Sequence, residues 1–330
     1  MSAPFRALRI FEQGGVSQGR FAELTLDELD PGEVLIRVNF SSVNYKDALA
    51  VTGKGRVIRR FPCIGGIDLA GVVEDSSDAR FKPGEAVLAT GYELGVAHDG
   101  GFARYARVPA DWVVPLPAGL SLFEAMALGT AGFTAALAIH RLEQNELTPD
   151  KGKVIVTGAT GGVGSLALQM LAQLGYHVVA LTGKESEQDY LRSLGAEEVL
   201  LRGSVDMKSA RPLEKGMWAG ALDAVGGDTL AWLTRTMQQE GAIASFGNAG
   251  GVELHTTVFP FILRGVKLLG VDSAATAMPL RGLLWQRLAG ELKPQALTRI
   301  AYRITMDDLP ATCAALIEGR ARGRAVLEIG

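Results

Sequence analysis

The chain has 330 residues, of which 48% are hydrophobic and 21% are charged, and its net charge is −3 at pH 7. This length allows two domains, each with its own core, and the composition is typical of an ordinary globular protein. The nearly balanced charge predicts no nucleic-acid partner, and two cysteines cannot form a disulfide framework.

Neither a signal peptide nor a membrane span is expected. Residues 1–10 lack the apolar core of a signal peptide. The longest uncharged apolar stretch, residues 125–139, contains two glycines and two threonines and is too short to cross a bilayer. We therefore expect a cytoplasmic protein with no membrane partner.

The first 120 residues are rich in short β-type runs separated by glycine, proline and aspartate. From about residue 125 the pattern changes to helices that alternate with short buried strands, which predicts βαβ units and a parallel sheet. The clearest early strands are 34–40, 71–74, 86–89 and 105–109. The later ones are 154–157, 177–181, 198–201, 220–224, 242–246 and 267–271.

After residue 292 the chain returns to a strand at 301–304, a helix at 308–318 and a strand at 325–329. The prediction is an α/β protein with a β-rich domain formed by residues 1–124 and 298–330. A Rossmann-type, doubly wound parallel sheet is inserted between these segments, at residues 125–297.

Residues 154–164, VIVTGATGGVG, turn from a strand into an apolar helix expected at 165–174. Gly161 and Gly164 stand at the second and third glycine positions of the dinucleotide fingerprint, and Ala159 stands at the first. Backbone N–H groups at such a helix start bind a pyrophosphate. The flanking strand and helix favour nucleotide binding over a merely tight turn.

The end of the second parallel strand indicates which dinucleotide is bound. An NAD-specific site has an acidic residue there, whereas this chain has Thr182, Gly183 and Lys184. Lys184 and Arg202, which follows the third strand, could both bind a 2′-phosphate. The alternative is that both are solvated surface charges, and Glu185 weakens the case slightly. We predict a preference for NADPH.

Several motifs in order along the chain resemble the medium-chain dehydrogenase/reductase superfamily. They are SSVNYKD (41–47), GGIDLAG (65–71), FKPGEAV (81–87), the glycine turn, DAVGG (223–227) and GRAV (323–326). Residues 44–50, 62–71 and 269–273 resemble more narrowly its zinc-free, quinone-oxidoreductase-like acrylyl-CoA reductase branch. This resemblance implies a GroES-like catalytic domain beside the Rossmann domain, and NADPH-dependent reduction of acrylyl-CoA to propionyl-CoA.

The same resemblance implies the cofactor contacts. Thr160, Gly161, Gly162 and Val163 would meet the pyrophosphate, Thr182, Gly183, Lys184 and Arg202 the 2′-phosphate end, and Tyr45, Asn248, Ile262 and Ser273 the remainder. The family often has an apolar residue in place of Asn248, so a backbone contact is the alternative there. Ile262 could instead be a core residue.

A metal is not expected. Zinc alcohol dehydrogenases of the superfamily have a cysteine where this chain has Asn44, and Gly-His-Glu where it has Gly66, Ile67 and Asp68. An isoleucine cannot bind zinc, and an amide replaces the thiolate. Without a Lewis acid, reduction of a C=C bond conjugated to a carbonyl is favoured, because that carbonyl already accepts charge.

The polar residues Asn44, Tyr45 and Asp47 directly follow an apolar strand. Tyr45 is the best candidate for the acid that protonates the enolate, because a phenol donates a hydrogen bond at neutral pH. Alternatively, Tyr45 only stacks on the nicotinamide, and Asp47 only caps the following helix.

Three classes of function remain open. An acyl-CoA thioester is the expected substrate, and the cations Lys54, Arg56, Arg59 and Arg60 could receive its phosphates, although such a run is more often a solvated loop. A zinc-free NADPH quinone or alkenal oxidoreductase is the alternative, and a non-enzymatic NADPH-binding protein is the third. A homodimer is expected because relatives often pair their sixth strands. The role of Arg324 is open.

Overall fold

The computed structural model describes residues 3–330, which divide into two compact units. Unit 1 contains the described residues up to Ala131 together with Ser273–Ala289 and Leu297–Gly330. Unit 2 contains Gly132–Asp272 and Gly290–Ala296. This division by packing assigns residues 125–131 and 273–289 to unit 1, which differs from the predicted domain ranges; those ranges stay a prediction.

Unit 1 is built on two sheets. β2 (Val16–Leu24), β1 (Phe5–Gln13) and β4 (Cys63–Ile64) form the smaller sheet in that order. The seven-stranded sheet has the order β15 (Ala301–Ile304), β16 (Arg324–Glu328), β3 (Val34–Ser42), β5 (Asp68–Ser76), β6 (Ala86–Thr90) and β8 (Val113–Pro115), with β7 (Tyr105–Val108) also paired to β3. The late strand β16 pairs with the early strand β3, so the last segment of the chain completes the sheet begun by the first 120 residues.

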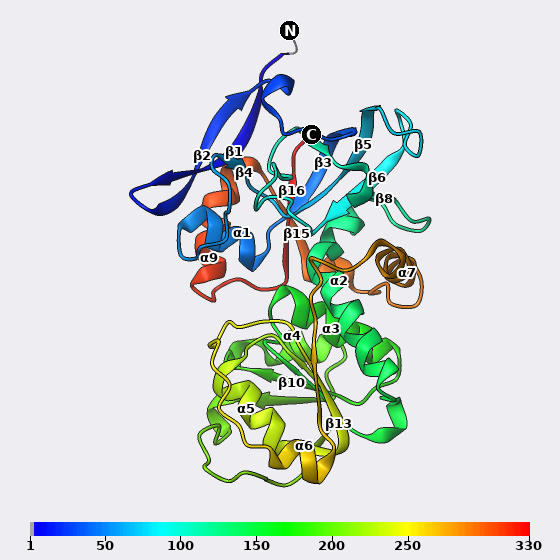
Figure 1. Ribbon diagram of the computed structural model, residues 1–330. Coiled ribbons are helices and arrows are strands. Elements are labelled where there is room, and N and C mark those ends of the chain that lie inside the picture. Colours follow the sequence, from blue (N-terminus) through cyan, green and yellow to red (C-terminus); the bar gives the residue numbers. More distant parts are fainter. Residues whose placement is uncertain (1–2) are drawn as a thin grey trace. The chain divides into compact units, whose positions relative to one another are not determined.

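Short helices complete unit 1. They are α1 (Tyr45–Thr52), α7 (Met278–Ala289), α8 (Leu297–Ile300) and α9 (Leu309–Ile317). Figure 1 shows α9 beside α1, and the two helices pack against each other. Three 3-10 turns are also present: η1 (Leu26–Glu28), η2 (Ala110–Trp112) and η6 (Met306–Asp308).

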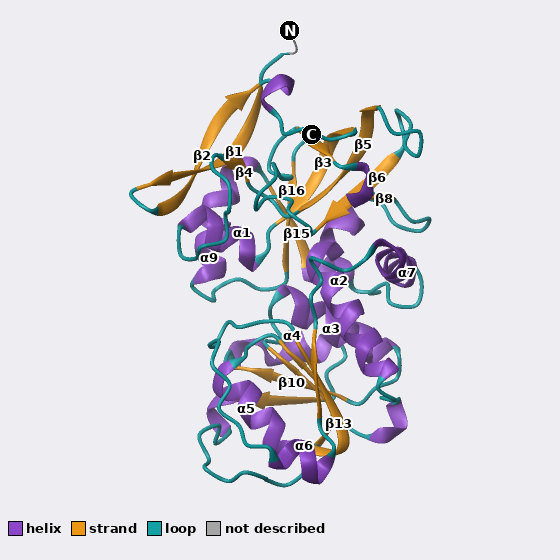
Figure 2. Ribbon diagram, viewed as in Figure 1, coloured by secondary structure: helices purple, strands orange, loops and turns teal. Residues whose placement is uncertain are grey.

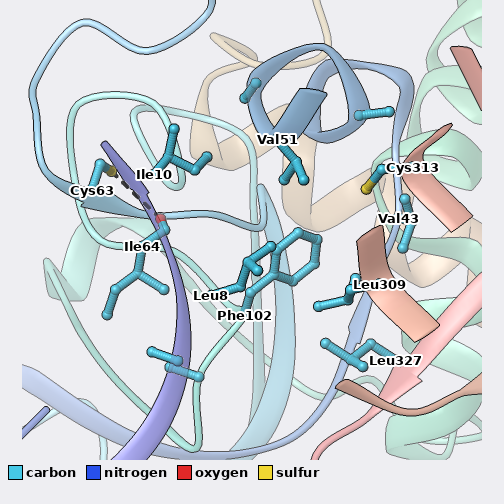
Figure 3. Packing of buried hydrophobic residues seen from close by; sticks show 14 of the residues in the cluster. Leu8, Ile10, Val43, Val51, Cys63, Ile64, Phe102, Leu309, Cys313 and Leu327 are labelled. Atoms are coloured by element: carbon cyan, nitrogen blue, oxygen red, sulfur yellow. Dashed lines mark hydrogen bonds between the residues drawn. The ribbon is translucent and has the colours of Figure 1, made fainter. Parts of the chain in front are cut away.

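Apolar side chains from distant parts of the sequence form the core between these elements. Leu8, Phe102 and Leu327 are buried together with residues of α1 and α9, as Figure 3 shows. Cys63 and Cys313 belong to the same cluster, and both are free thiols. Burial of this cluster ties the N-terminal strands to the C-terminal segment, because each covers apolar surface that the other would otherwise expose to water.

Unit 2 has the predicted parallel sheet. Its strand order is β11 (Glu198–Leu201), β10 (Val178–Thr182), β9 (Val154–Thr157), β12 (Trp218–Asp223), β13 (Met237–Ser245) and β14 (Lys267–Gly270). This is the order of a doubly wound dinucleotide-binding fold, with the topological switch point between β9 and β12. Each predicted strand is confirmed to within a few residues, except that β13 begins five residues earlier than predicted.

Helices flank this sheet, as Figure 2 shows. They are α3 (Gly162–Gln173), α4 (Gln188–Ser193), α5 (Gly227–Thr236) and α6 (Phe259–Arg264), with 3-10 turns η3 (Pro149–Lys151), η4 (Glu185–Glu187) and η5 (Arg202–Ser204). The helix predicted at 165–174 begins three residues earlier than expected, because the glycines at 162 and 164 already adopt its first turn.

The helix α2 (Leu122–Gln144) contains the stretch judged too short to span a membrane. By length and composition it could cross one, since an 18-residue window has a mean hydropathy of 1.6. However, 78% of that window is buried inside the protein, which is typical of a core helix. α2 is kinked at Gly129, whose φ of 50° and ψ of −153° are not helical.

Candidate functional site

The glycine turn has the geometry predicted for a dinucleotide site. Gly158 follows β9 with φ of +58°, and Gly161 is the residue before the first turn of α3. A Cβ on Gly164 would collide with the carbonyl oxygen of Gly158 and lie 2.7 Å from the Cα of Ala159. Gly164 therefore allows the close approach of helix and strand.

The first turn of α3 consists of the uncharged residues Gly162, Val163, Gly164 and Ser165. Thr160 is buried, whereas Gly161, Gly162 and Val163 are partly exposed at the helix start. The N–H groups at a helix start lack intrahelical acceptors and carry a partial positive charge. This end of α3 is therefore suited to a pyrophosphate.

The two predicted phosphate-binding cations follow neighbouring strands of the sheet. β10 and β11 are parallel neighbours, with Thr182 opposite Leu201, so the residues that follow each strand emerge side by side. The guanidinium of Arg202 packs over Gly183, where an added Cβ would lie 3.1 Å from Nη2. The hydroxyl of Thr182 accepts a hydrogen bond of 3.0 Å from the backbone N–H of Lys184.

A pocket of about 440 Å³ opens next to Arg202 within unit 2. It is lined by residues that follow β11, β12 and β13: Arg202, Val205, Asp206, Met207, Lys208, Val225, Gly226, Asp228, Thr229 and Gly250. Sequence reasoning missed Lys208, because a lysine in a polar loop looks like a solvated surface charge. Its place beside Arg202 became visible only with the fold.

Asp223 stabilises the topological switch point between β9 and β12, where doubly wound sheets bind their ligands. Its buried carboxylate accepts hydrogen bonds from Thr157 Oγ1 at 2.7 Å and from the N–H of Gly226 at 2.9 Å. Burial raises the pKa of this carboxyl above its usual value, and these hydrogen bonds partly offset that effect. The ends of β9 and β12 are thereby held together.

The other predicted cofactor residues are spread over both units. Asn248 lies on an exposed loop after β13. Ile262 is on α6 with 67% of its surface exposed, so the core alternative for it is wrong. Ser273 follows β14 and belongs to unit 1, as does Tyr45.

Tyr45 begins α1, and 40% of its surface is exposed. The backbone N–H of Asn44, the residue before it, donates a 2.8 Å hydrogen bond to the carboxylate of Asp47. The second oxygen of Asp47 accepts a 2.9 Å hydrogen bond from the N–H of Ile67. Asp47 therefore caps the helix, as the alternative interpretation proposed, and also ties it to the segment before β5.

A buried polar cluster lies behind Tyr45. Asp68 is fully buried, and its Oδ2 accepts hydrogen bonds from Ser42 Oγ (2.5 Å), Asn44 Nδ2 (2.8 Å) and the N–H of Thr130 (2.9 Å). Its Oδ1 accepts one from Thr130 Oγ1 at 2.5 Å. Asp47 is also buried, and burial together with the charge of Asp68 raises its pKa to about 7.

Arg324 completes the cluster from the other end of the chain. It is buried, and its guanidinium donates to Ser42 Oγ at 2.7 Å and Asn44 Oδ1 at 3.0 Å, while Nη2 lies 3.7 Å from Asp68 Oδ2. It also donates to the carbonyls of Val43 and Ala127. The sequence left the role of Arg324 open. These contacts indicate that it holds the Asn44 amide in place.

Within residues 3–330, no group of three or more His, Cys, Asp or Glu side chains is arranged to hold a metal ion. Asn44 and Asp68 occupy two of the positions compared with zinc enzymes. They are hydrogen-bonded to each other, and Arg324 donates a hydrogen bond to Asn44 and forms an ion pair with Asp68. Ile67, at the third, is buried.

The four cations after α1 are not equivalent. Arg59 pairs with Glu93, and Arg60 pairs with Asp30. The side chains of Lys54 and Arg56 are exposed and form no ion pair within the described part of the chain. Only these two are therefore available for an anionic ligand.

Two family models match the chain. Residues 30–118 match the alcohol dehydrogenase GroES-like domain, and residues 162–286 match the zinc-binding dehydrogenase family. The acrylyl-CoA reductase AcuI of Ruegeria pomeroyi is 46% identical over 318 residues, which cover 96% of each chain.

The Bacillus subtilis protein named "Putative quinone oxidoreductase YhfP" is 47% identical over the full length of both chains. Its structure with NAD bound has a TM-score of 0.96 and covers 99% of this chain and 100% of that one. The YhdH oxidoreductase of Salmonella enterica, in complex with NADP, has a TM-score of 0.95 at 47% identity, with 98% and 100% covered.

Proposed function

Because this chain belongs to the acrylyl-CoA reductase family of the medium-chain dehydrogenase/reductase superfamily, we propose that it reduces acrylyl-CoA to propionyl-CoA. It is an oxidoreductase whose cofactor is NADPH. The observation that carries the choice of substrate is the 46% identity to AcuI over 96% of both chains.

The residues of unit 2 fit this cofactor. The uncharged first turn of α3 offers N–H groups to a pyrophosphate, and Gly164 provides the space that a Cβ would fill. Lys184 and Arg202 supply positive charge at the strand ends where an NAD-specific protein would carry an acid. The 440 Å³ pocket beside Arg202 is the candidate place for the adenosine end.

We assign the individual contacts as follows. Thr160, Gly161, Gly162 and Val163 bind the pyrophosphate, and Thr182, Gly183, Lys184 and Arg202 bind the 2′-phosphoribose. Asn248, Ile262, Ser273 and Tyr45 contact the rest of the dinucleotide. Ile262 has the least support in this assignment, because Arg264 on the same helix donates hydrogen bonds to the carbonyls of Arg235 and Met237 at the start of β13, whereas dinucleotides bind at the carboxyl ends of the strands.

When bound, NADPH supplies the hydride that is added to the β-carbon of the enoyl thioester. The chain must then stabilise the charge that develops on the thioester oxygen and deliver a proton to the α-carbon. Tyr45 is the proposed proton donor. Its side chain is partly exposed, and the hydrogen bonds of Asn44 and Asp47 hold the backbone from which it projects.

A quinone or alkenal reductase is the second candidate, because YhfP is as similar to this chain as AcuI is. NADPH oxidation should be compared with acrylyl-CoA, crotonyl-CoA, a simple enone and a quinone. We expect the highest kcat/KM with acrylyl-CoA. Saturable turnover with the quinone alone would reject the proposed reaction and favour the second candidate.

A homodimer is proposed as well. β14 is the edge strand of its sheet, and Leu268 on it is 37% exposed. The neighbouring helix region adds Val258 (63%) and Leu263 (56%). An exposed strand edge flanked by apolar side chains is suited to pairing with a second copy. Light scattering should give twice the chain mass, and Leu268→Lys should shift it to one chain mass. We propose a cytoplasmic location.

A further inference from the structure

The segment 273–276 has no regular secondary structure, yet its backbone is held by many contacts. It follows β14 and leads into α7. Arg281, on α7, is fully buried. Its Nη2 donates to the carbonyls of Ser273 at 3.1 Å and Ala274 at 3.0 Å, and its Nε donates to that of Thr276 at 3.3 Å.

The same guanidinium also reaches the end of β6. Its Nη1 donates to the carbonyl of Thr90 at 2.9 Å and to the Thr90 hydroxyl at 3.0 Å. Arg281 therefore joins the carbonyls of segment 273–276 to a strand of the large sheet. A planar guanidinium with several N–H donors can bridge separate acceptors in this way, whereas a lysine ammonium cannot reproduce its fork.

Tyr92 also holds this segment. Its backbone N–H donates to the Ala274 carbonyl at 2.9 Å. Its hydroxyl donates to the backbone carbonyl of Thr276 at 3.3 Å. The Arg281 guanidinium lies 4.4 Å from the centre of the Tyr92 ring, which also stacks on Trp112 at 5.5 Å. The Tyr92 ring is thus packed against both the Arg281 guanidinium and the Trp112 ring.

The turn that carries Tyr92 is strained. Tyr92 has φ of +51°, a region that non-glycine residues rarely adopt. Gly91 before it has φ of +76°, and a Cβ there would lie 3.0 Å from the Cα and the carbonyl oxygen of Ala274. Strain and a buried cation are both costly, and such features persist where surrounding contacts determine one conformation.

We propose that Arg281 and Tyr92 are positioning residues that hold Ser273 where it meets the nicotinamide end of NADPH. This inference rests on the proposed function, which assigns Ser273 to the cofactor. Without the two side chains, segment 273–276 would populate several conformations. Affinity for NADPH would then fall in proportion to the population of the competent one.

The first test is Tyr92→Phe, which removes one hydrogen bond and keeps the ring stacked. Loss of a neutral hydrogen bond corresponds to an increase of about three- to ten-fold in the Kd of NADPH, measured by calorimetry. The KM of acrylyl-CoA should change little. Gly91→Ala should act in the same direction through the contact with Ala274. Tyr105→Phe, whose ring packs edge-on against Phe5, is the control.

Arg281→Met and Arg281→Lys extend the series. Methionine should raise the Kd more than Tyr92→Phe does, and lysine should recover only part of the affinity. Hydrogen exchange of the amides at 274–276 should become faster in each variant. If Arg281→Met fails to fold, Tyr92→Phe and Gly91→Ala still decide the question.

A lower melting temperature with an unchanged NADPH Kd would overturn the proposal, because the two residues would then be merely structural. Ser273→Ala separates the remaining cases. If it leaves NADPH affinity unchanged, the positioning role is rejected whatever the other variants do. If the wild-type protein binds NADPH but does not reduce acrylyl-CoA, the proposed reaction fails while the affinity series still tests the positioning.

Discussion

Removal of Arg202 tests the assignment of the cofactor most directly. Arg202 packs over Gly183 at the end of β10 and lines the 440 Å³ pocket. NADPH differs from NADH only in the 2′-phosphate, so the two cofactors form a natural control for any contact with that group. Arg202→Ala should weaken the binding of NADPH and leave the binding of NADH nearly unchanged.

The expected loss of NADPH affinity in Arg202→Ala follows from the exposure of this side chain. A hydrogen bond to a charged group contributes about 1.5–3 kcal/mol, and solvent screening of the exposed Arg202 favours the lower end of that range. The predicted effect is therefore about a ten-fold rise in the NADPH Kd. Lys184→Ala should have a similar effect on the NADPH Kd. Because both side chains are proposed to bind one phosphate, the effect of the double variant should be smaller than the product of the two single effects.

Kd values for both cofactors should be measured by fluorescence quenching at two ionic strengths, together with kcat/KM. In the wild type, the ratio of the NADH Kd to the NADPH Kd should decrease at high salt, because salt screens the charge of the 2′-phosphate. In Arg202→Ala this ratio should decrease less. Arg192→Ala is a matched control, since this cation lies on α4 and pairs with Asp189. Equal losses of NADPH and NADH affinity in Arg202→Ala would refute the assignment. The assignment would also be refuted if Lys208→Ala raised the NADPH Kd ten-fold while Arg202→Ala left it unchanged.

Four further predictions concern unit 1. Tyr45→Phe should lower kcat for acrylyl-CoA by about 100-fold if its hydroxyl delivers the proton, and unchanged turnover would remove that role. Gly129→Ala should lower the free energy of unfolding by about 2–5 kcal/mol, because its Cβ would lie 2.6 Å from Asp68 Oδ2 at an unfavourable φ; Gly175→Ala, with positive φ but open space, is the control in chemical denaturation. The Asp47 carboxyl has a pKa of about 7 in the folded state and 3.8 as its ordinary value, so folding retains its proton between these pH values and stability falls as pH rises through that window. Asp47→Asn should remove this decline, seen as a wild-type-minus-variant difference that changes between pH 4 and 7 and is constant above 8; a difference that is flat throughout would contradict the raised pKa. Lys54→Ala with Arg56→Ala should raise the KM of acrylyl-CoA several-fold without affecting a simple enone, and an equal effect on both substrates would exclude a CoA contact there.

The local pattern of unit 2 was sufficient to predict its fold. The strands and the glycine turn were readable because a buried parallel strand is a continuous apolar run, and a strand-to-helix turn needs glycine at fixed offsets. The placement of Lys184 and Arg202 at the ends of neighbouring strands could also be foreseen, since residues that follow neighbouring parallel strands emerge at the same edge. Lys208 carried no such signal.

The sequence by itself determined the parallel strands of the nucleotide unit, its anion-binding turn and the replacement of zinc ligands by Asn44 and Ile67. Only the tertiary structure decided that Arg324 reaches Asn44 across 280 residues, that Gly129 makes room for the Asp68 cluster, and that segment 273–276 is held by Arg281 and Tyr92. The physical reason is that strands, turns and helix starts depend on neighbours within a few residues. A buried charge is stable only where distant chain segments together supply its partners.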